Sequence, residues 1–112
     1  MDTLKQHQDI IKELLKETAL YYKGTTNPLS LQSIIDRTER HFQLLMYGWD
    51  EGKYFYQCLY HLELRDSKVW IHWNTTDISI EQELMSKGVS AENIVLGVKH
   101  PDYCQFTNFA VA

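Results

Sequence analysis

Three apolar segments separated by two tight-turn signals occupy the middle of the chain. Residues 41–49, 54–64 and 68–73 are rich in the aromatic and branched side chains that strands favour. The turn signals are residues 50–53 (DEGK) and 65–68 (RDSK). Connections this short leave neighbouring strands antiparallel. The sequence therefore predicts a three-stranded meander at the centre of the fold.

The segments before the meander predict a helix and a strand. In residues 3–22 the apolar side chains recur at helical spacing and form one stripe. Residues 24–28 (GTTNP) have the composition of a loop. Residues 31–37 predict a further short strand, which we place at an edge of the sheet.

The segments after the meander predict a second helix and a packed tail. Ser79 and Gln82 have capping-box spacing and begin a helix over residues 79–87. Residues 90–93 have the composition of a short helical turn, and the apolar residues 94–97 follow. The tail, residues 103–112, ends in apolar side chains that we expect to pack against the fold. The chain is thus predicted to be one α+β domain over residues 1–112: an N-terminal helix, an antiparallel meander sheet of three to four strands, a short helix and a packed C-terminal tail.

The lengths of the two turns decide which side chains share a face of the sheet. A two-residue loop at Asp66-Ser67 places His61 opposite His72. The core face of these strands then carries Tyr56, Cys58, Tyr60, Leu62, Leu64, Val69, Ile71 and Trp73. At the first turn, a three-residue loop with left-handed Gly52 adds Phe42, Leu44 and Met46 to that face, whereas a two-residue loop adds Leu45, Tyr47 and Trp49. We prefer the three-residue loop because it keeps His41 and Gln43 out of the core.

In the preferred register the opposite face is more apolar than a sheet face in contact with water usually is. Its apolar side chains are Leu45, Tyr47, Trp49, Phe55, Leu59 and Trp70. Two interpretations stay open. The second helix and the tail could cover this face while the first helix covers the other. Alternatively, the six residues form an exposed interface for a protein partner or for a homodimer.

Charge and cysteine content disfavour several classes of protein. The net charge is −4, with 11 basic residues scattered among 15 acidic ones. Proteins that hold a phosphate backbone cluster their basic residues, so we expect no direct nucleic-acid binding unless the fold assembles a local patch. Cys58 and Cys104 form no CxxC pair. The N-terminus is too charged for a signal peptide, and no apolar stretch reaches the roughly 20 residues that span a bilayer. We therefore expect a cytoplasmic protein.

The pair His61 and His72, with Glu63 on the same face, is the best candidate for chemistry. A catalytic zinc site needs three protein ligands, and a loop residue such as Asp77 would have to complete this one. A hydrolase or nuclease using His61, His72 and Asp77 is thus the alternative to a binding protein. No GxSxG, P-loop or GxGxxG motif occurs. We expect no enzyme activity, no metal and no cofactor.

The chain also resembles the XisI family, named for an excision controlling factor of heterocyst-forming cyanobacteria. The matching residues are spread over nearly the whole sequence. They are Met1-Asp2-Thr3-Leu4, Gly48-Trp49-Asp50 with Gly52, Cys58 and His61, Lys68-Val69-Trp70-Ile71, Thr76-Asp77, Glu83-Leu84, Gly88-Val89, Glu92-Asn93-Ile94-Val95-Leu96-Gly97, Pro101, Thr107 and Phe109-Ala110-Val111-Ala112. The chain departs from the family pattern at His72, Asn74, Val98 and His100, which weakens any metal site that depends on His72.

The resemblance implies an accessory role in the programmed excision of a DNA element. Members of the family are associated with a site-specific recombinase and with a nuclease-like companion, XisH, and the DNA chemistry belongs to those partners. The resemblance therefore implies an XisH-like protein partner and a binding role rather than catalysis.

Overall fold

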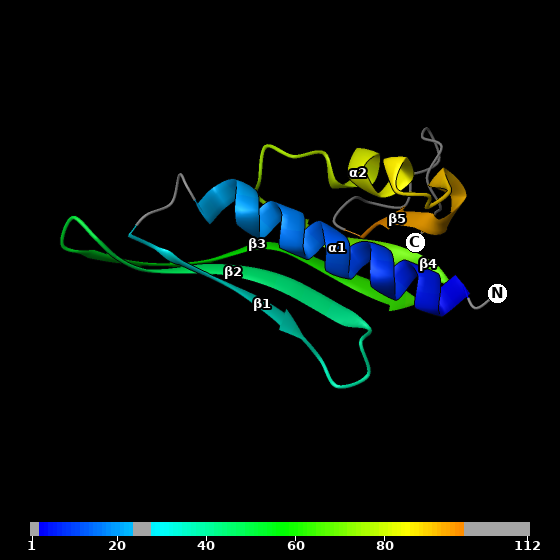
Figure 1. Ribbon diagram of the computed structural model, residues 1–112, viewed down its shortest axis with the longest axis horizontal. Helices are drawn as coiled ribbons and strands as arrows, with labels where there is room; N and C mark the ends of the chain where they lie inside the picture. The colour runs from blue at the N-terminus through cyan, green and yellow to red at the C-terminus, as the bar shows by residue number, and fades with distance from the viewer. Residues whose placement is uncertain (1–2, 24–27, 98–112) are drawn as a thin grey trace.

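The computed structural model describes residues 3–23 and 28–97 (Figure 1). Its elements, in chain order, are α1 (Thr3–Lys23), β1 (Ser30–Ile35), β2 (His41–Asp50), β3 (Lys53–Arg65), β4 (Lys68–Asn74), α2 (Ile80–Ser86), a 3-10 turn (Ala91–Asn93) and β5 (Ile94–Leu96). The strands form one sheet in the order β1-β2-β3-β4-β5. The predicted α+β fold is confirmed, and β1 lies at an edge as expected.

Both hairpins of the meander close through two-residue loops. Glu51 and Gly52 have φ angles of 50° and 79°, and Asp66 and Ser67 have φ angles of 53° and 63°. Left-handed backbone at both loop positions suits the twist of the flanking strands. The loop predicted at Asp66-Ser67 is confirmed. The three-residue loop preferred for the first hairpin is wrong, because Asp50 pairs directly with Lys53.

A bulge in β3 explains why neither predicted register describes the whole first hairpin. Leu44 pairs with Tyr60, but the next residue, Leu45, pairs with Cys58, so Leu59 is an extra residue. On β2, therefore, Phe42, Leu44 and Met46 do face the core, as preferred. On β3, the alternation of faces changes phase at the bulge. Leu59 is consequently only 4% exposed and belongs to the core, and its predicted place on the opposite face is wrong.

A second bulge lies between β3 and β4. His61 pairs with Trp73 and Leu62 with Ile71, so His72 is the extra residue. The predicted pairing of His61 with His72 is therefore displaced by one residue. Trp73 and Tyr56, both predicted to face the core, are instead exposed.

The fifth strand makes the sheet mixed rather than purely antiparallel. The apolar segment 94–97 forms β5, which pairs in parallel with β4 through Val69–Ile94 and Ile71–Leu96. Parallel neighbours need a crossover connection, and α2 lies within it, capped at its start by the Ser79 hydroxyl. Both helices lie over the same face of the sheet (Figure 1).

The core fills the space between the helices and this covered face. It contains Ile11, Leu14 and Leu15 of α1, Ile80 and Leu84 of α2, and the inward side chains of β2, β3, β4 and β5. The core includes Tyr60, whose hydroxyl donates to Thr18 Oγ1 over 3.1 Å while the Thr18 hydroxyl donates to the Leu14 carbonyl over 2.8 Å. Burial raises the pKa of Tyr60 to about 12. No helix among the described residues is long and apolar enough to cross a bilayer. The predicted tail and most of the predicted 24–28 loop lie outside the described residues.

Candidate functional site

The sheet face opposite the helices is the candidate site, and we call it the outer face. No helix or strand of residues 3–23 and 28–97 covers it (Figure 1). The interpretation in which α2 helps to cover this face is wrong, because α2 packs beside α1 in the same core. The tail, the other part of that interpretation, lies outside the described residues. Strand alternation and the two bulges place on the outer face His41, Gln43, Leu45, Tyr47, Trp49, Tyr54, Tyr56, Cys58, His61, Glu63, Arg65, Trp70, His72 and Trp73.

One end of the outer face lies on a projecting hairpin. The ends of β2 and β3 extend beyond the helices (Figure 1), and we call residues 47–56 the aromatic arm. On its outer face Trp49 and Tyr54 meet edge to face with ring centroids 5.4 Å apart. Tyr56 on the same face is 68% exposed, and Phe55 on the opposite face is also exposed. Large aromatic side chains gathered in the open are typical of surfaces that bind another protein.

The six predicted interface residues divide into three groups. Leu45, Tyr47, Trp49 and Trp70 lie on the outer face. Phe55 is exposed, but it pairs with Gly48 on the other face of the arm. Leu59 is the core residue described above. The bulge in β3 replaces the last two with Tyr54 and Tyr56, and the second bulge adds Trp73. As an interface, the set stays a prediction.

The other end of the outer face carries a polar cluster, which we call the histidine cluster: His41, His61, Glu63, Arg65, Trp70 and His72. Glu63 is at its centre. Arg65 donates to both carboxylate oxygens, from Nη2 over 2.8 Å and from Nε over 3.3 Å. His72 Nε2 lies 2.7 Å from Glu63 Oε1, and His41 Nε2 lies 3.6 Å from Oε2. One carboxylate thus faces three basic side chains.

The rings of His61 and Trp70 contact the other members of the cluster. His41 Nδ1 lies 3.2 Å from His61 Nε2, and the rings of His61 and His72 have centroids 5.3 Å apart. The Trp70 ring stacks near His72, and the Arg65 guanidinium lies 4.2 Å above the centroid of Trp70. Arginine over an indole face is a favourable cation–π contact. His72 lies two residues after Trp70 on the same strand, so alternation places both rings on the outer face.

The cluster lowers the pKa of Glu63 and of His61 and raises that of Arg65. Hydrogen bonds from Arg65 and then His72 lower the pKa of Glu63 to about 2. Burial, followed by the nearby His72 and His41, lowers the pKa of His61. At neutral pH the cluster therefore holds a charged carboxylate–guanidinium pair next to a neutral His61.

The structure does not bring the predicted polar site together. His61 and His72 do lie side by side, but Asp77 lies near the end of α1. There it contributes, after burial, to raising the pKa of the Tyr22 phenol. Within the described part of the chain no group of three or more histidine, cysteine or acidic side chains is arranged to hold a metal ion. His41 Nδ1 and His61 Nε2 lie 3.2 Å apart, within hydrogen-bond distance of one another.

Sequence reasoning missed two members of the cluster. The sequence predicts that His41 lies outside the core but does not indicate its contact with His61. The pairing of His61 with Gln43 puts His41 and His61 on neighbouring strands and on the same face of the sheet. Arg65 was read only as a turn residue. Its position two residues after Glu63 on a strand was the available signal, since such residues share a face.

Fold and site together define a small α+β domain with helices on one sheet face and an aromatic, histidine-bearing surface on the other. The chain belongs to the XisI family, whose family model, described as "XisI protein", matches residues 1–111. Two similar solved structures come from Anabaena variabilis. One, described as a XisI-like protein, is 32% identical with a TM-score of 0.87. The other, described as the fdxN element excision controlling factor XisI, is 28% identical with a TM-score of 0.80. Each alignment covers 99% of this chain and 100% of the other. No curated protein matches significantly.

Proposed function

We propose that the chain is a protein-binding accessory factor, without enzyme activity of its own, that acts in excision control as the name of its A. variabilis relative indicates. The observation that carries this proposal is the aromatic arm, where Trp49, Tyr54, Phe55 and Tyr56 are exposed on both faces of one hairpin. Water contact with so much aromatic surface is unfavourable, and a protein partner would bury it. The net charge of −4 supports a protein partner rather than DNA.

The partner we propose is an XisH-like protein. The arm projects beyond the helices (Figure 1), so a partner can contact both of its faces at once. The histidine cluster borders the same surface and adds polar groups with fixed geometry, because Glu63 and Arg65 hold one another. An aromatic centre beside a polar border is the usual composition of a specific interface. If no heterologous partner is present, a second copy of the chain is the occupant we propose for this face.

Co-purification with an XisH-like protein from the same genome tests the proposal. We expect Tyr56→Ala to weaken the complex by at least about tenfold in Kd, since truncating a central aromatic residue commonly costs 2 kcal/mol or more. Tyr21→Ala is the matched control, because Tyr21 is 65% exposed but lies on α1. Equal loss in both variants, or wild-type binding by Tyr56→Ala and Trp49→Ala, would contradict a role for the arm.

The alternative of a hydrolase or nuclease has no specific support in this geometry. Its three proposed residues are not assembled, and His61 is engaged by His41. Nuclease activity that co-purifies with the isolated chain and disappears in His61→Ala would overturn the non-enzymatic proposal.

A further inference from the structure

The outward side of β1 presents backbone groups that no described strand pairs. β1 is the end strand of the sheet, and β2 lies on its other side. The Asp36 amide donates to the His41 carbonyl, so by alternation the even-numbered residues of β1 point their backbone groups at β2. Leu31, Ser33 and Ile35 then point theirs outward. We call these groups the β1 edge. Gln32 Nε2 donates to the outward Ser33 carbonyl, as expected from this alternation.

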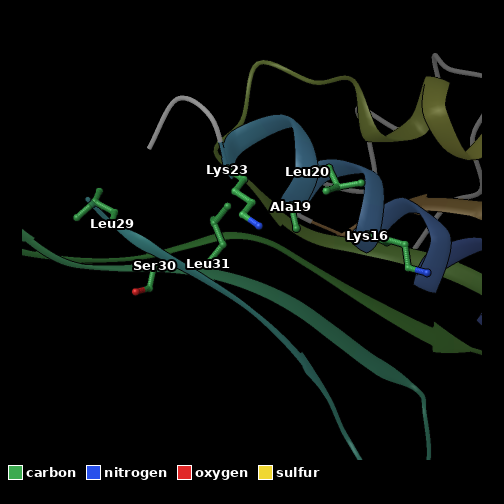
Figure 2. Close-up of a pocket in the computed structure, with 7 residues that line it drawn as sticks. All are labelled: Lys16, Ala19, Leu20, Lys23, Leu29, Ser30 and Leu31. Carbon is green, nitrogen blue, oxygen red and sulfur yellow. The ribbon is translucent and has the colours of Figure 1, made fainter. Parts of the chain in front are cut away.

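A groove runs beside the β1 edge. It has a volume of about 490 Å³ and lies between the second half of α1 and the beginning of β1. Figure 2 shows Leu31 rising from the strand toward Ala19 of the helix, with Leu29 at one end. The groove floor is thus apolar, and a helix forms its far wall. An edge strand beside a helix, with an apolar groove between them, is the arrangement that accepts a peptide by β-strand addition.

The charges around the groove are basic, and the strand itself is uncharged. Lys16 and Lys23 of α1 line the groove (Figure 2), seven residues and about 10 Å apart along the helix. Neither lysine forms a salt bridge within the described residues. None of the six residues of β1 (SLQSII) is charged, although exposed edge strands commonly carry charges or proline that block pairing.

We propose that the β1 edge and this groove bind an extended segment of a protein partner, which adds to the sheet as a sixth strand. The segment carries an apolar side chain that enters the groove between Ala19 and Leu31. Acidic side chains flank it on the same face and reach Lys16 and Lys23. Side chains two residues apart on a strand lie about 7 Å from one another, so an acid–x–apolar–x–acid pattern spans the two lysines. This surface is separate from the outer face.

Fluorescence anisotropy with a synthetic peptide tests the proposal. The probe is fluorescein-labelled serine-glutamate-threonine-valine-threonine-glutamate-serine. Two controls replace both glutamates by lysine or methylate the alternate backbone nitrogens, which removes the donors that pair with an edge. We expect saturable binding of the probe alone. No saturable binding, or equal binding of the methylated peptide, overturns the proposal.

Protein variants separate the edge from the groove. Ser33→Pro removes an outward amide but no bond to β2, and we expect a roughly fivefold or greater loss of affinity, the value of one or more hydrogen bonds. The Lys16→Glu/Lys23→Glu double variant should bind the probe at least roughly threefold more weakly at low salt and favour the lysine peptide. Thermal unfolding shows whether each variant is folded. If Ser33→Pro is not folded, Ile35→Pro, which removes another outward amide, replaces it. Unchanged affinity in folded variants overturns the proposal.

Light scattering tests the competing occupant, a second copy of the chain. A monomer has a mass of 13.2 kDa, and a dimer formed through the outer face should persist in Ser33→Pro and dissociate in Tyr56→Ala. A dimer that Ser33→Pro or Ile35→Pro dissociates would place another copy on the edge and overturn the peptide proposal. Tyr56→Ala should bind the probe as wild type does. Loss of binding at the β1 edge would therefore be seen in the Ser33 and lysine variants, whereas loss of binding at the outer face would be seen in Tyr56→Ala.

Discussion

The covered face and the outer face of the sheet are built by the same strands yet have different compositions. On the covered face, inward side chains such as Phe42, Leu44 and Leu62 are completely buried. On the outer face, their immediate neighbours in sequence are two histidines, a glutamate, a glutamine and a partly exposed leucine. Because successive residues of a strand point to opposite faces, one chain segment can hold the core with one set of residues and present a surface with the other. The difference teaches that stability and binding can be altered separately here.

The largest difference in stability between the two faces is expected at two neighbouring leucines of β2. Leu44 is fully buried, whereas Leu45 is partly exposed on the outer face. We expect Leu44→Ala to lower the free energy of unfolding by about 3 kcal/mol, because it leaves a cavity in the core. Leu45→Ala should cost about 1 kcal/mol or less. Urea denaturation measures both. Equal losses would mean that the outer face is covered in solution.

The sequence could predict those parts of this arrangement that local features determine. The helices, the first four strands and the turn at Asp66-Ser67 followed from periodicity and turn chemistry. The two bulges did not, because a bulge is decided by how Leu59 and His72 pack in three dimensions, and alternation alone assumes an unbroken register. Consequently the outer face was expected, but Leu59 was misplaced and Tyr56 was missed. Part of the histidine cluster was predicted, because a register error of one residue still leaves His61 near His72. The parallel pairing of β5 is a long-range contact, and its apolar sequence fits other environments equally well.

Two titratable side chains of the outer face, Glu63 and His61, should make the stability of the fold depend on pH. The pKa of Glu63 in the folded protein is about 2, below its ordinary 4.5. Its contribution to stability is therefore complete above pH 4.5 and is lost as the pH falls toward 2. The lowered pKa of His61 contributes stability that is complete above pH 6.5 and is lost as the pH falls below that value. Urea midpoints across this range should fall in two steps.

Variants separate the contribution of the outer face to each step from that of the covered side. Glu63→Gln should reduce the step below pH 4.5, to which Asp36 also contributes because the hydrogen bond from the Thr38 side chain and the backbone amides beside it lower its pKa. His61→Gln should reduce the step below pH 6.5. His7, on the helix side, provides the contrast, because burial alone lowers its pKa. His7→Gln should therefore change the upper step without altering the lower one. If His61→Gln leaves the upper step as it is in wild type, the outer-face histidines do not couple to folding.

The buried hydroxyl of Tyr60 tests a polar contact on the covered face. Tyr60→Phe removes its hydrogen bond to Thr18, while the bond from Thr18 to the Leu14 carbonyl stays in place. We expect a loss of about 1 kcal/mol in the free energy of unfolding. Tyr54→Phe, on the exposed arm, is the control and should be within error of wild type in urea denaturation. A larger loss for Tyr54→Phe would show that the arm contributes to the core.

The smallest effect is expected at a turn that belongs to neither face. Ser67 has a φ angle of 63°, a left-handed backbone conformation that residues other than glycine adopt at a cost in free energy. Ser67→Gly should therefore raise the free energy of unfolding by up to about 1 kcal/mol, whereas Gly52→Ala in the other turn, where φ is 79°, should lower it by a similar amount. Neither change alters a side chain of the outer face. Ser67→Gly should accordingly bind an XisH-like partner as wild type does, so a change in its affinity that followed its stability would show that folding and binding are not separate in this domain.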